Sequence, residues 1–314
     1  MTRPLAIAIV NPNTGRRSVN ALVDALRDEL SGCFRLVVRV TAHAGHAEEL
    51  ARLAAEATDT VIAVGGDGTV SQVATGLRGS GATLGIIPIG TANVIARGLG
   101  IPLDLGRAAR LLCGPHEVRV LDALELGDRL ALHVVGCGFD ALMVEAAPRA
   151  LKRAAAWFAY VPSALRNVNE GPWGFEITVD EQEVTTVAKM VLIANGSFVL
   201  QPRFELAQDI RADDGNLDVL VFSPPNLVAA TATASRLALG QLEGSPHVQH
   251  YRGRFARVAS EPVSPVECDG DADGTTPVEV RVLPKAIPII VPIPTSWSRE
   301  ALAAIRQFMP RPRD

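Results

Sequence analysis

The amino-acid sequence predicts an α/β domain followed by a mainly-β domain, and two observations support this. In the first third of the 314-residue chain, short β-branched runs alternate with helical segments, which is typical of a parallel sheet covered by helices on both faces. Beyond about Pro115 the strand-like runs follow one another mostly without helices between them, which favours an antiparallel β-sandwich.

Strand and helix signals alternate regularly in the first part. The predicted strands are 5–10, 34–40, 60–64 and 83–88, and the predicted helices are 18–30, 46–57, 70–77 and 92–97. Ligands of such sheets bind at the carboxyl ends of the strands. We therefore expect Asn11, Thr41, Gly65 and Gly90, which each follow or end a strand, to share one rim.

The second part is rich in strands and has few helices. Its predicted strands are 118–126, 130–135, 175–179, 187–194, 217–222, 254–260, 278–283 and 287–294. Helices are expected at 141–169 and 227–239, and an amphipathic helix at 298–308 that docks back on the first domain. This pattern predicts a mainly antiparallel sandwich.

Composition limits the classes of partner and compartment. Hydrophobic residues make up 48% and charged residues 20% of the chain, as in soluble globular proteins. The formal net charge of −4 gives no broad basic field, so nucleic acid is not an expected partner. Four scattered cysteines indicate a reduced cytoplasmic protein with buried thiols. With no signal peptide or transmembrane-length run expected, a lipid substrate would be approached from the aqueous side.

The most informative motif is the glycine-rich run at 65–69, Gly-Gly-Asp-Gly-Thr, which directly follows an apolar strand. Glycines let the backbone approach an anion, and the amides of the next helix point at it. A carboxylate beside a phosphate requires a cation between them, so Asp67 predicts Mg²⁺-nucleotide chemistry. The alternative is an ordinary strand–turn–helix junction.

Lysine usage excludes one way of binding the phosphates. No lysine precedes Lys152, so the first part cannot contain a P-loop, which needs Gly-Lys-Ser/Thr. The Rossmann G-x-G-x-x-G is also missing after the first strand, where 11–15 reads Asn-Pro-Asn-Thr-Gly. Backbone amides, hydroxyls, arginines and metal must therefore hold any phosphates.

Six short motifs occur in one order along the chain. They are Asn11-Pro12 with Gly15, Gly65-Gly66-Asp67-Gly68-Thr69, the run 88–93 (Pro-Ile-Gly-Thr-Ala-Asn) with Ala96-Arg97, the run 136–141 (Gly-Cys-Gly-Phe-Asp-Ala), Asp214-Gly215, and Asp269-Gly270-Asp271. Together they resemble the soluble bacterial diacylglycerol kinase family, which also includes the sphingosine and ceramide kinases.

This resemblance implies a three-layer α/β nucleotide-binding domain of the NAD kinase/phosphofructokinase type, a C-terminal antiparallel β-sandwich, and an active cleft between them. We place the ATP-binding domain at 1–118, together with the C-terminal helix 295–314. The β-sandwich that binds the lipid substrate and metal is placed at 119–294.

The resemblance also implies the ATP contacts, at the ends of the strands and in the glycine loop. These residues are Asn11, Pro12, Asn13, Thr14, Gly15, Thr41, Gly65, Gly66, Asp67, Gly68, Thr69, Val70, Ser71, Gln72, Gly90, Thr91 and Asn93. The cofactors expected are therefore ATP and Mg²⁺.

A structural Mg²⁺ site is implied in the second domain. Asp214 would give its carboxylate, and Arg211 and Asn216 their main-chain carbonyls. Such oxygen ligands suit Mg²⁺. The alternative is a plain hairpin turn, for which Asp-Asp-Gly-Asn is a common composition.

The catalytic residues are implied at 269–271. Phosphoryl transfer to an alcohol needs a carboxylate that accepts the hydroxyl proton. We expect Asp269 and Asp271 to act together, with Asp67 on the nucleotide metal. Relatives usually have glutamate where this chain has Asp271, and many have an acidic residue at the place of Val94. The alternative is a solvated acidic loop.

The expected function is an ATP- and Mg²⁺-dependent lipid kinase acting on diacylglycerol or a similar lipid. Such a protein would be cytoplasmic and would associate transiently with the membrane surface. A homodimer is possible. The segment 148–169 combines basic and aromatic residues, which suits either an anionic lipid surface or packing on the sandwich. Alternatives are a kinase of a sphingoid lipid or of NAD, or a non-catalytic, nucleotide-gated lipid-binding protein.

Overall fold

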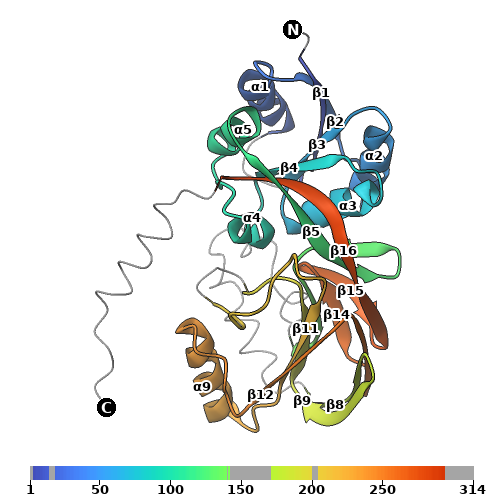
Figure 1. Ribbon diagram of the computed structural model, residues 1–314, viewed down its shortest axis with the longest axis vertical. Coiled ribbons are helices and arrows are strands. Elements are labelled where there is room, and N and C mark those ends of the chain that lie inside the picture. Colours follow the sequence, from blue (N-terminus) through green and yellow to red (C-terminus); the bar gives the residue numbers. More distant parts are fainter. Residues whose placement is uncertain (1–2, 14–17, 140, 142–170, 200–203, 294–314) are drawn as a thin grey trace, which may run out of the picture.

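A computed structural model describes residues 3–13, 18–139, 141, 171–199 and 204–293 (Figure 1). In these residues the chain forms one sheet of ten strands and another of six. The expected helices 141–169 and 298–308, and with them the segments 148–169 and 295–314, lie outside the described residues. None of the described helices is both long and apolar enough to span a membrane.

The first domain has three layers, as the alternation of strands and helices predicts. Its parallel strands lie in the order β2 (Arg35–Val40), β1 (Leu5–Val10), β3 (Thr60–Gly65) and β4 (Thr83–Pro88). One face carries α2 (His46–Ala55), α3 (Asp67–Leu77) and α4 (Val94–Gly98). The other face carries α1 (Val19–Leu30) and α5 (Leu105–Cys113).

Helix α1 shows how the local sequence produces this packing. The Ser18 hydroxyl oxygen accepts a hydrogen bond from the Ala21 amide at 3.3 Å, which caps the first turn. Leu22, Leu26 and Leu30 recur every fourth residue, and each is at most 3% exposed. Because burying one such leucine contributes about 2 kcal/mol, this stripe holds the helix on the sheet.

The second domain is a sandwich of antiparallel layers. One layer is the six-stranded sheet, in the order β12 (Val248–Gly253), β11 (Leu217–Phe222), β10 (Met190–Ala194), β7 (Val134–Gly138), β14 (Pro265–Cys268) and β15 (Asp271–Thr275). The other contains β16 (Val278–Val291), β13 (Phe255–Glu261), β8 (Trp173–Val179) and β9 (Gln182–Ala188). Phe175 from one layer and Val191 from the other meet in a shared core. Helix α9 (Leu227–Ala238) follows β11.

Strand β16 belongs to both domains. Its first half pairs with β13 of the sandwich, and its second half reaches β4 of the α/β sheet, where Ile289 lies opposite Leu84. Along its length β16 also pairs with β5 (Glu117–Leu126), which in turn pairs with β6 (Arg129–Ala131). Figure 1 shows β5 and β16 running side by side from the upper domain into the lower one.

Several elements differ from the sequence-based expectation. The expected strands 278–283 and 287–294 are one strand, β16, with an irregularity between Leu283 and Ile287. The expected strand 130–135 divides into β6 and β7, and 187–194 into β9 and β10. Strands β12, β14 and β15 and helix α5 were not expected. Strand β15 has the sequence Asp-Ala-Asp-Gly-Thr and is mostly exposed, so it lacks the apolar alternation of a strand.

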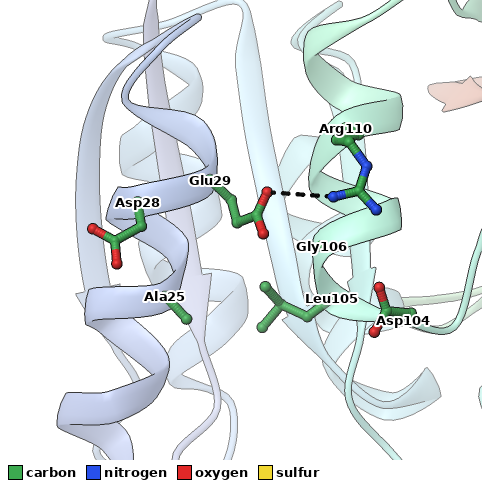
Figure 2. A pocket seen from close by; sticks show the side chains of 7 residues that line it. All are labelled: Ala25, Asp28, Glu29, Asp104, Leu105, Gly106 and Arg110. Carbon is green, nitrogen blue, oxygen red and sulfur yellow. Dashed lines mark ion pairs between the residues drawn. The ribbon is translucent and has the colours of Figure 1, made fainter.

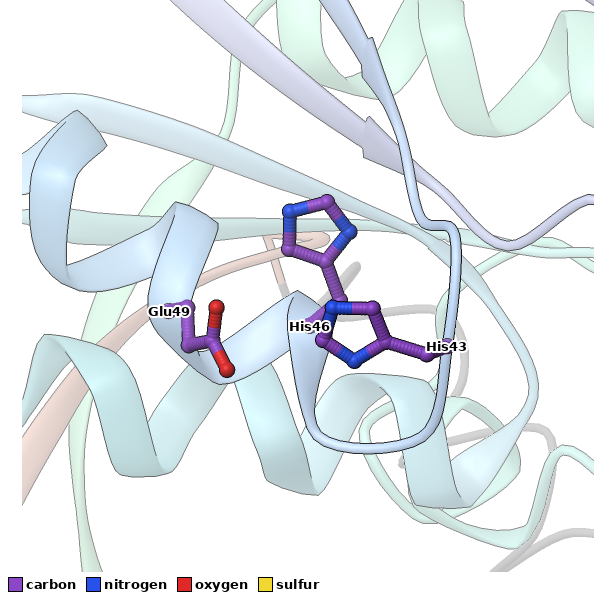
Figure 3. Close-up of side chains that lie close together, drawn as sticks. All are labelled: His43, His46 and Glu49. Atoms are coloured by element: carbon purple, nitrogen blue, oxygen red, sulfur yellow. The ribbon is translucent and has the colours of Figure 1, made fainter.

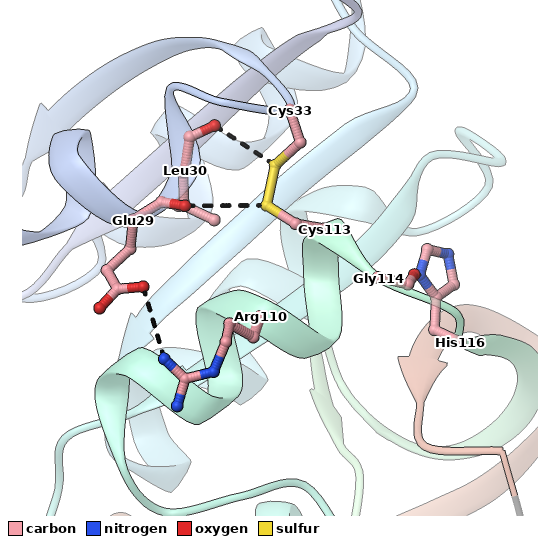
Figure 4. The surroundings of a disulfide bond; sticks show 7 residues. All are labelled: Glu29, Leu30, Cys33, Arg110, Cys113, Gly114 and His116. Atoms are coloured by element: carbon pink, nitrogen blue, oxygen red, sulfur yellow. Dashed lines mark hydrogen bonds and ion pairs between the residues drawn. A yellow bond between two sulfur atoms is a disulfide. The ribbon is translucent and has the colours of Figure 1, made fainter.

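The cysteines correct another expectation. Cys33, after α1, and Cys113, at the end of α5, form a disulfide across a sequence separation of 80 residues (Figure 4). Their Cα atoms are 5.6 Å apart. The expectation of four reduced thiols is therefore wrong for this pair, whereas Cys137 and Cys268 are buried thiols that form no disulfide. The fold brings α1 and α5 together on one face, which cysteine spacing alone did not indicate.

This disulfide predicts a redox-dependent stability. Closing a loop of 80 residues in the unfolded chain stabilises the fold by about 4 kcal/mol in the chain-entropy model. Cys33→Ser, Cys113→Ser and the double variant should each lose about that much free energy of unfolding, measured in urea without reductant. Reductant should lower the urea concentration at which half of the wild type is unfolded, and it should leave that of the double variant unchanged. A wild-type curve that ignores reductant would contradict the prediction.

Candidate active site

The carboxyl ends of the parallel strands form one rim, as expected. The Asn11 amide donates to the Val64 carbonyl at 3.0 Å, and the Thr41 amide to the Val10 carbonyl at 2.9 Å. The Asn11 side chain crosses this rim, where its Nδ2 donates to the Thr69 hydroxyl at 3.0 Å. The predicted polar groups of the first and third strands are therefore in direct contact.

The glycine loop is the first turn of helix α3. This helix begins at Asp67 rather than at the expected position 70, with Gly66 as its N-cap. The Val70 amide donates to the Gly66 carbonyl at 3.1 Å, so the amides of 67–69 precede the first intrahelical bond. These amides, at the positive end of the helix dipole, are suited to bind an anion. The other predicted contacts, Val70, Ser71 and Gln72, lie further inside the helix.

Two backbone segments approach each other closely beside this turn. A β-carbon on Gly90 would lie only 2.5 Å from the Cα of Gly66 and 2.7 Å from the Asn93 side-chain oxygen. Only glycine fits at position 90 without moving the chain. The loops after β3 and β4 therefore meet at the place where a phosphate would be held.

Asn93 lies beside the loop after β4, and its side-chain oxygen is an acceptor without a hydrogen bond among the described residues. Its backbone is left-handed, with a φ of 48°, and its Nδ2 donates to the Gly90 carbonyl at 2.9 Å. The side chain is 6% exposed, and its Oδ1 has no hydrogen-bond partner among the described residues. A buried carbonyl oxygen normally has a donor, so this atom fits a water or a polar ligand group.

Asp67 is the carboxylate of the glycine loop. Its Oδ1 accepts a hydrogen bond from the Ile95 amide at 2.9 Å, which ties the loop to the start of α4. Burial raises the pKa of the Asp67 carboxyl to about 6 and the nearby charge of Asp269 adds to the rise, although backbone amides of α4 oppose it. A bound cation would favour the ionised form, so Asp67 is suited to meet a metal.

Asp269 is buried in a complete set of hydrogen bonds. Its Oδ1 accepts from the amides of His133 and Val134, at 3.0 and 2.9 Å. Its Oδ2 accepts from the Leu132 amide at 2.7 Å and from the Ser71 hydroxyl at 2.5 Å. The residue is 6% exposed and has a left-handed backbone with a φ of 48°. Asp269 thus joins the β14–β15 turn to the β6–β7 connection and to helix α3.

Asp271 reaches the glycine loop from the second domain. It is exposed at the start of β15, and an added β-carbon on Gly68 would lie 2.1 Å from its Oδ2. The carboxylate therefore lies directly against the first turn of α3. Asp273, in the middle of the same strand, pairs with Arg129. Of the two predicted catalytic carboxylates, Asp271 is the exposed one at this loop.

The predicted metal residues lie in the loop before β11. The Asp214 Oδ1 accepts from the Asn216 amide at 3.0 Å, and its Oδ2 is 3.8 Å from the Arg252 guanidinium. The Arg211 side chain pairs with Asp213 at 3.1 Å, which leaves its carbonyl as the predicted ligand. A carboxylate and carbonyls are the donor types that Mg²⁺ prefers, although Arg252 already brings a positive charge. The metal assignment stays a prediction.

Asp122 connects this loop to β16. Its Oδ2 accepts from the Gly215 amide and its Oδ1 from the Lys285 amide, both at 2.7 Å. Lys285 lies at the irregularity of β16 with a φ of 51°. The Asp122 carboxylate is therefore held by backbone amides.

Some residues lie outside the site or were missed. Thr14 and Gly15 are not among the described residues. Sequence reasoning missed Asn195, whose Nδ2 donates to the carbonyls of Asp122 and Leu132 at 3.0 and 2.9 Å. A single asparagine after an apolar strand gives no signal of this role.

A separate pocket lies between helices α1 and α5 (Figure 2). It contains none of the predicted site residues, and its charged lining includes the Glu29–Arg110 ion pair at 3.8 Å. The residues that line it are Ala25, Asp28, Glu29, Asp104, Leu105, Gly106 and Arg110. We assign the functional site to the strand rim instead, because the glycine loop and both carboxylates meet there.

Comparisons with known proteins find related sequences over most of the chain. The family model of the diacylglycerol kinase catalytic domain matches residues 5–125, and that of the YegS C-terminal NAD kinase β-sandwich-like domain matches residues 133–291. An uncharacterized protein of Synechocystis sp. is 31% identical over 305 residues, which cover 92% of this chain and 70% of that protein. A "putative lipid kinase" of Staphylococcus haemolyticus is 27% identical over 236 residues, covering 74% of this chain and 76% of that protein.

Solved structures of other proteins resemble this fold as well. A crystal structure described as a diacylglycerol kinase from Bacillus anthracis str. Sterne aligns with a TM-score of 0.77 and 26% identity. The alignment covers 93% of this chain and 98% of the other. The likeness therefore extends over both domains.

The hydrogen bonds of Asp269 predict a structural cost for its amide variant. In Asp269→Asn an NH₂ group replaces one oxygen, so two of the four donors lose their acceptor. We expect a loss of about 2–4 kcal/mol in the free energy of unfolding, measured in urea. Ser71→Ala removes one donor only and should cost about 1–2 kcal/mol. An Asp269→Asn variant as stable as the wild type would contradict this assignment.

Because the pKa of Asp67 is raised, we expect its amide variant to be more stable than the wild type at high pH. The folded state holds the Asp67 proton more tightly than the unfolded chain, so ionisation destabilises the fold as pH rises through about 4 to 6. Asp67→Asn keeps an oxygen for the Ile95 amide and removes the buried charge. Without ligand at pH 8, we expect it to be about 1–3 kcal/mol more stable than the wild type.

The measurement is urea unfolding of both proteins at pH 8 and pH 4. The difference should become small at pH 4, because the Asp67 carboxyl of the folded protein is then protonated and that of the unfolded chain is near its ordinary pKa of 3.8. Asp67→Ala, which also removes the acceptor of Ile95, serves as the control. A variant that is less stable than the wild type at pH 8 would show that the ionised carboxylate stabilises the fold.

Proposed function

Because the chain belongs to the family of the diacylglycerol kinase catalytic domain, we propose that it is a lipid kinase. It transfers the γ-phosphate of ATP to the hydroxyl of diacylglycerol or of a similar lipid. Family membership supports kinase activity, and the names of relatives support a lipid as the acceptor.

One observation carries the proposal: the Asp271 carboxylate lies against Gly68 in the glycine loop. A group that accepts a proton and a loop that holds phosphates thus come from different domains and meet at one place. Phosphoryl transfer to an alcohol needs this pairing, because the hydroxyl must lose its proton where the phosphate is positioned.

The reaction follows from these groups. Asp271 accepts the proton of the lipid hydroxyl, and the oxygen forms a bond to the γ-phosphorus. The bond between this phosphorus and the β–γ bridging oxygen breaks, and ADP leaves with that oxygen. Since the shorter aspartate replaces the usual glutamate, the lipid hydroxyl must approach the glycine loop closely.

The nucleotide is held mainly by neutral groups. The amides of 67–69 and the close approach of Gly66 and Gly90 suit the phosphates. The Asn93 Oδ1, which has no hydrogen-bond partner in the part of the chain that the structure describes, supplies an acceptor beside them. Bound Mg²⁺ would neutralise phosphate charge, and Asp67 is the carboxylate suited to hold it.

Asp269 is a positioning residue in this proposal. All four of its hydrogen bonds come from the protein, so its carboxylate is engaged before any substrate binds. Its role is to set the turn that presents Asp271, two residues later, to the loop. Where the sequence-based expectation has Asp269 and Asp271 acting together, we propose that the two have different roles.

The acceptor is proposed to lie at a membrane surface that the protein visits from the cytoplasm. Two other acceptors, a sphingoid lipid and NAD, remain outcomes of the test. A non-catalytic lipid-binding protein is the alternative of another class, supported by Asp271 in place of glutamate and by the apolar Val94. Nucleic acid is not proposed as a partner, and a homodimer stays an expectation.

The test is transfer of labelled phosphate from Mg-ATP to diacylglycerol, monoacylglycerol, ceramide and sphingosine in micelles, and to NAD in solution. We expect labelled phosphatidic acid from the wild type. Asp271→Asn should lower kcat by about 10²–10⁴-fold and leave ATP binding and the unfolding midpoint near those of the wild type.

Two further variants sharpen the test. Gly68→Ala keeps Asp271 but pushes its carboxylate from the loop, so kcat should fall while the base is still present. Asp271→Glu keeps the carboxylate and should retain more activity than Asp271→Asn. Label on a sphingoid lipid or NAD alone would show that this molecule, and not diacylglycerol, is the acceptor. ATP binding without transfer to any acceptor would favour the non-catalytic alternative.

A further inference from the structure

A group of metal-ligating side chains lies between strand β2 and the first turn of helix α2, beginning two residues after the predicted ATP contact Thr41. Among the described residues, His43, His46 and Glu49 are the one set of three whose ligand atoms lie within 4.8 Å of one another. His43 precedes helix α2, and His46 and Glu49 occupy its first turn. Figure 3 shows the two imidazole rings one above the other with the carboxylate beside them.

The two rings are held together in the free protein. Their centroids are 4.6 Å apart and their planes differ by 9°. A tetrahedral Zn²⁺ with bonds of about 2.0–2.2 Å holds its ligand atoms roughly 3.4 Å apart. His43 and Glu49 are exposed, so side-chain rotation alone can close the remaining gap.

The tautomer of His43 is set for metal binding. Its Nδ1 is 3.0 Å from the Ala44 carbonyl, which can only accept a hydrogen bond. The neutral ring therefore carries its proton on Nδ1 and leaves the Nε2 lone pair for a metal. Metal-bound histidines almost always have such a bond from the second ring nitrogen to a carbonyl or carboxylate.

His46 requires a local change. The Ala42 amide donates to its Nδ1 at 2.9 Å, so in the free protein this nitrogen is an acceptor and the neutral ring carries its proton on Nε2. His46 can bind a metal only if the metal takes the place of the Ala42 amide, or if the ring turns. In either case the Ala42 hydrogen bond breaks when the metal binds.

We propose that His43, His46 and Glu49 form a binding site for a divalent transition metal such as Zn²⁺. Two imidazoles and one carboxylate select such ions over Mg²⁺, which prefers oxygen ligands alone. With three protein ligands and an exposed position, the ion keeps at least one open position for water or a further ligand. The proposal does not depend on the kinase assignment, because none of its three ligands is among the residues predicted to contact ATP or to catalyse the transfer.

The test is titration of the chelator-treated full-length protein with Zn²⁺ against a competing fluorescent chelator, in an excess of Mg²⁺ that would occupy any site with a preference for oxygen ligands. We expect His43→Ala and Glu49→Gln to weaken binding at one site by at least about tenfold relative to the wild type. The matched control is His116→Ala. His116 is also exposed, and its Nδ1 lies 3.0 Å from a backbone carbonyl, that of Gly114, but it belongs to no such group among the described residues.

A second readout follows the Ala42 amide by NMR. Zn²⁺ should shift this resonance and speed its hydrogen exchange in the wild type and in His116→Ala, but not in His43→Ala. All variants lie on the surface, and a circular dichroism melt confirms that they are folded. Equal Zn²⁺ affinity and stoichiometry in the wild type and His43→Ala, or an Ala42 amide that does not respond to Zn²⁺, would overturn the proposal.

Discussion

The buried carboxylate of Asp269 is the interaction on which the arrangement of the site depends. Three successive amides, at the β6–β7 connection and the start of β7, and the Ser71 hydroxyl of helix α3 all donate to it. An anion with four donors in a buried place is stable, whereas each of those donors without it would be an unpaired polar group. The same set of bonds therefore fixes the turn that carries Asp271 and joins the sandwich to the helix of the glycine loop.

Beside this well-ordered contact, the glycine loop contains two groups that are unfavourable for the stability of the free protein. Asp67 is ionised only against the effect of burial, and Asn93 keeps an acceptor without a partner among the described residues. Both features are unfavourable in the free protein, and both are relieved by a ligand that brings a cation and hydrogen-bond donors. Perturbed carboxylates and unused polar atoms are typical of functional sites for this reason.

Much of the fold could be predicted from the sequence, because the strands of the first domain are short apolar runs followed by turn residues. The family and the two-domain fold are confirmed, and strands β1 and β4 have the expected bounds. Helix α3 begins earlier than expected, since three glycines suggest a loop even where they form the first turn of a helix. Strand β15 was missed because its residues are polar and exposed.

The site could be predicted less completely, since its contacts join residues far apart in sequence. The motifs named Asp269, Ser71 and Asp271, but no spacing indicates that the Ser71 hydroxyl donates to Asp269 across 198 positions. The disulfide was missed for the same reason, because Cys33 and Cys113 meet only after α1 and α5 pack on one sheet.

Strand β16 has a consequence for the order in which the protein forms during synthesis. Its side chains enter all three main cores: Val278 and Val280 that of the sandwich, and Ile289 and Ile290 those on the two faces of the first sheet. Domains usually fold one after another as they leave the ribosome. Here the N-terminal half emerges early but lacks one of its own strands until the last part of the sandwich has been made. Neither half can therefore complete its strand pairing until β16 has been made.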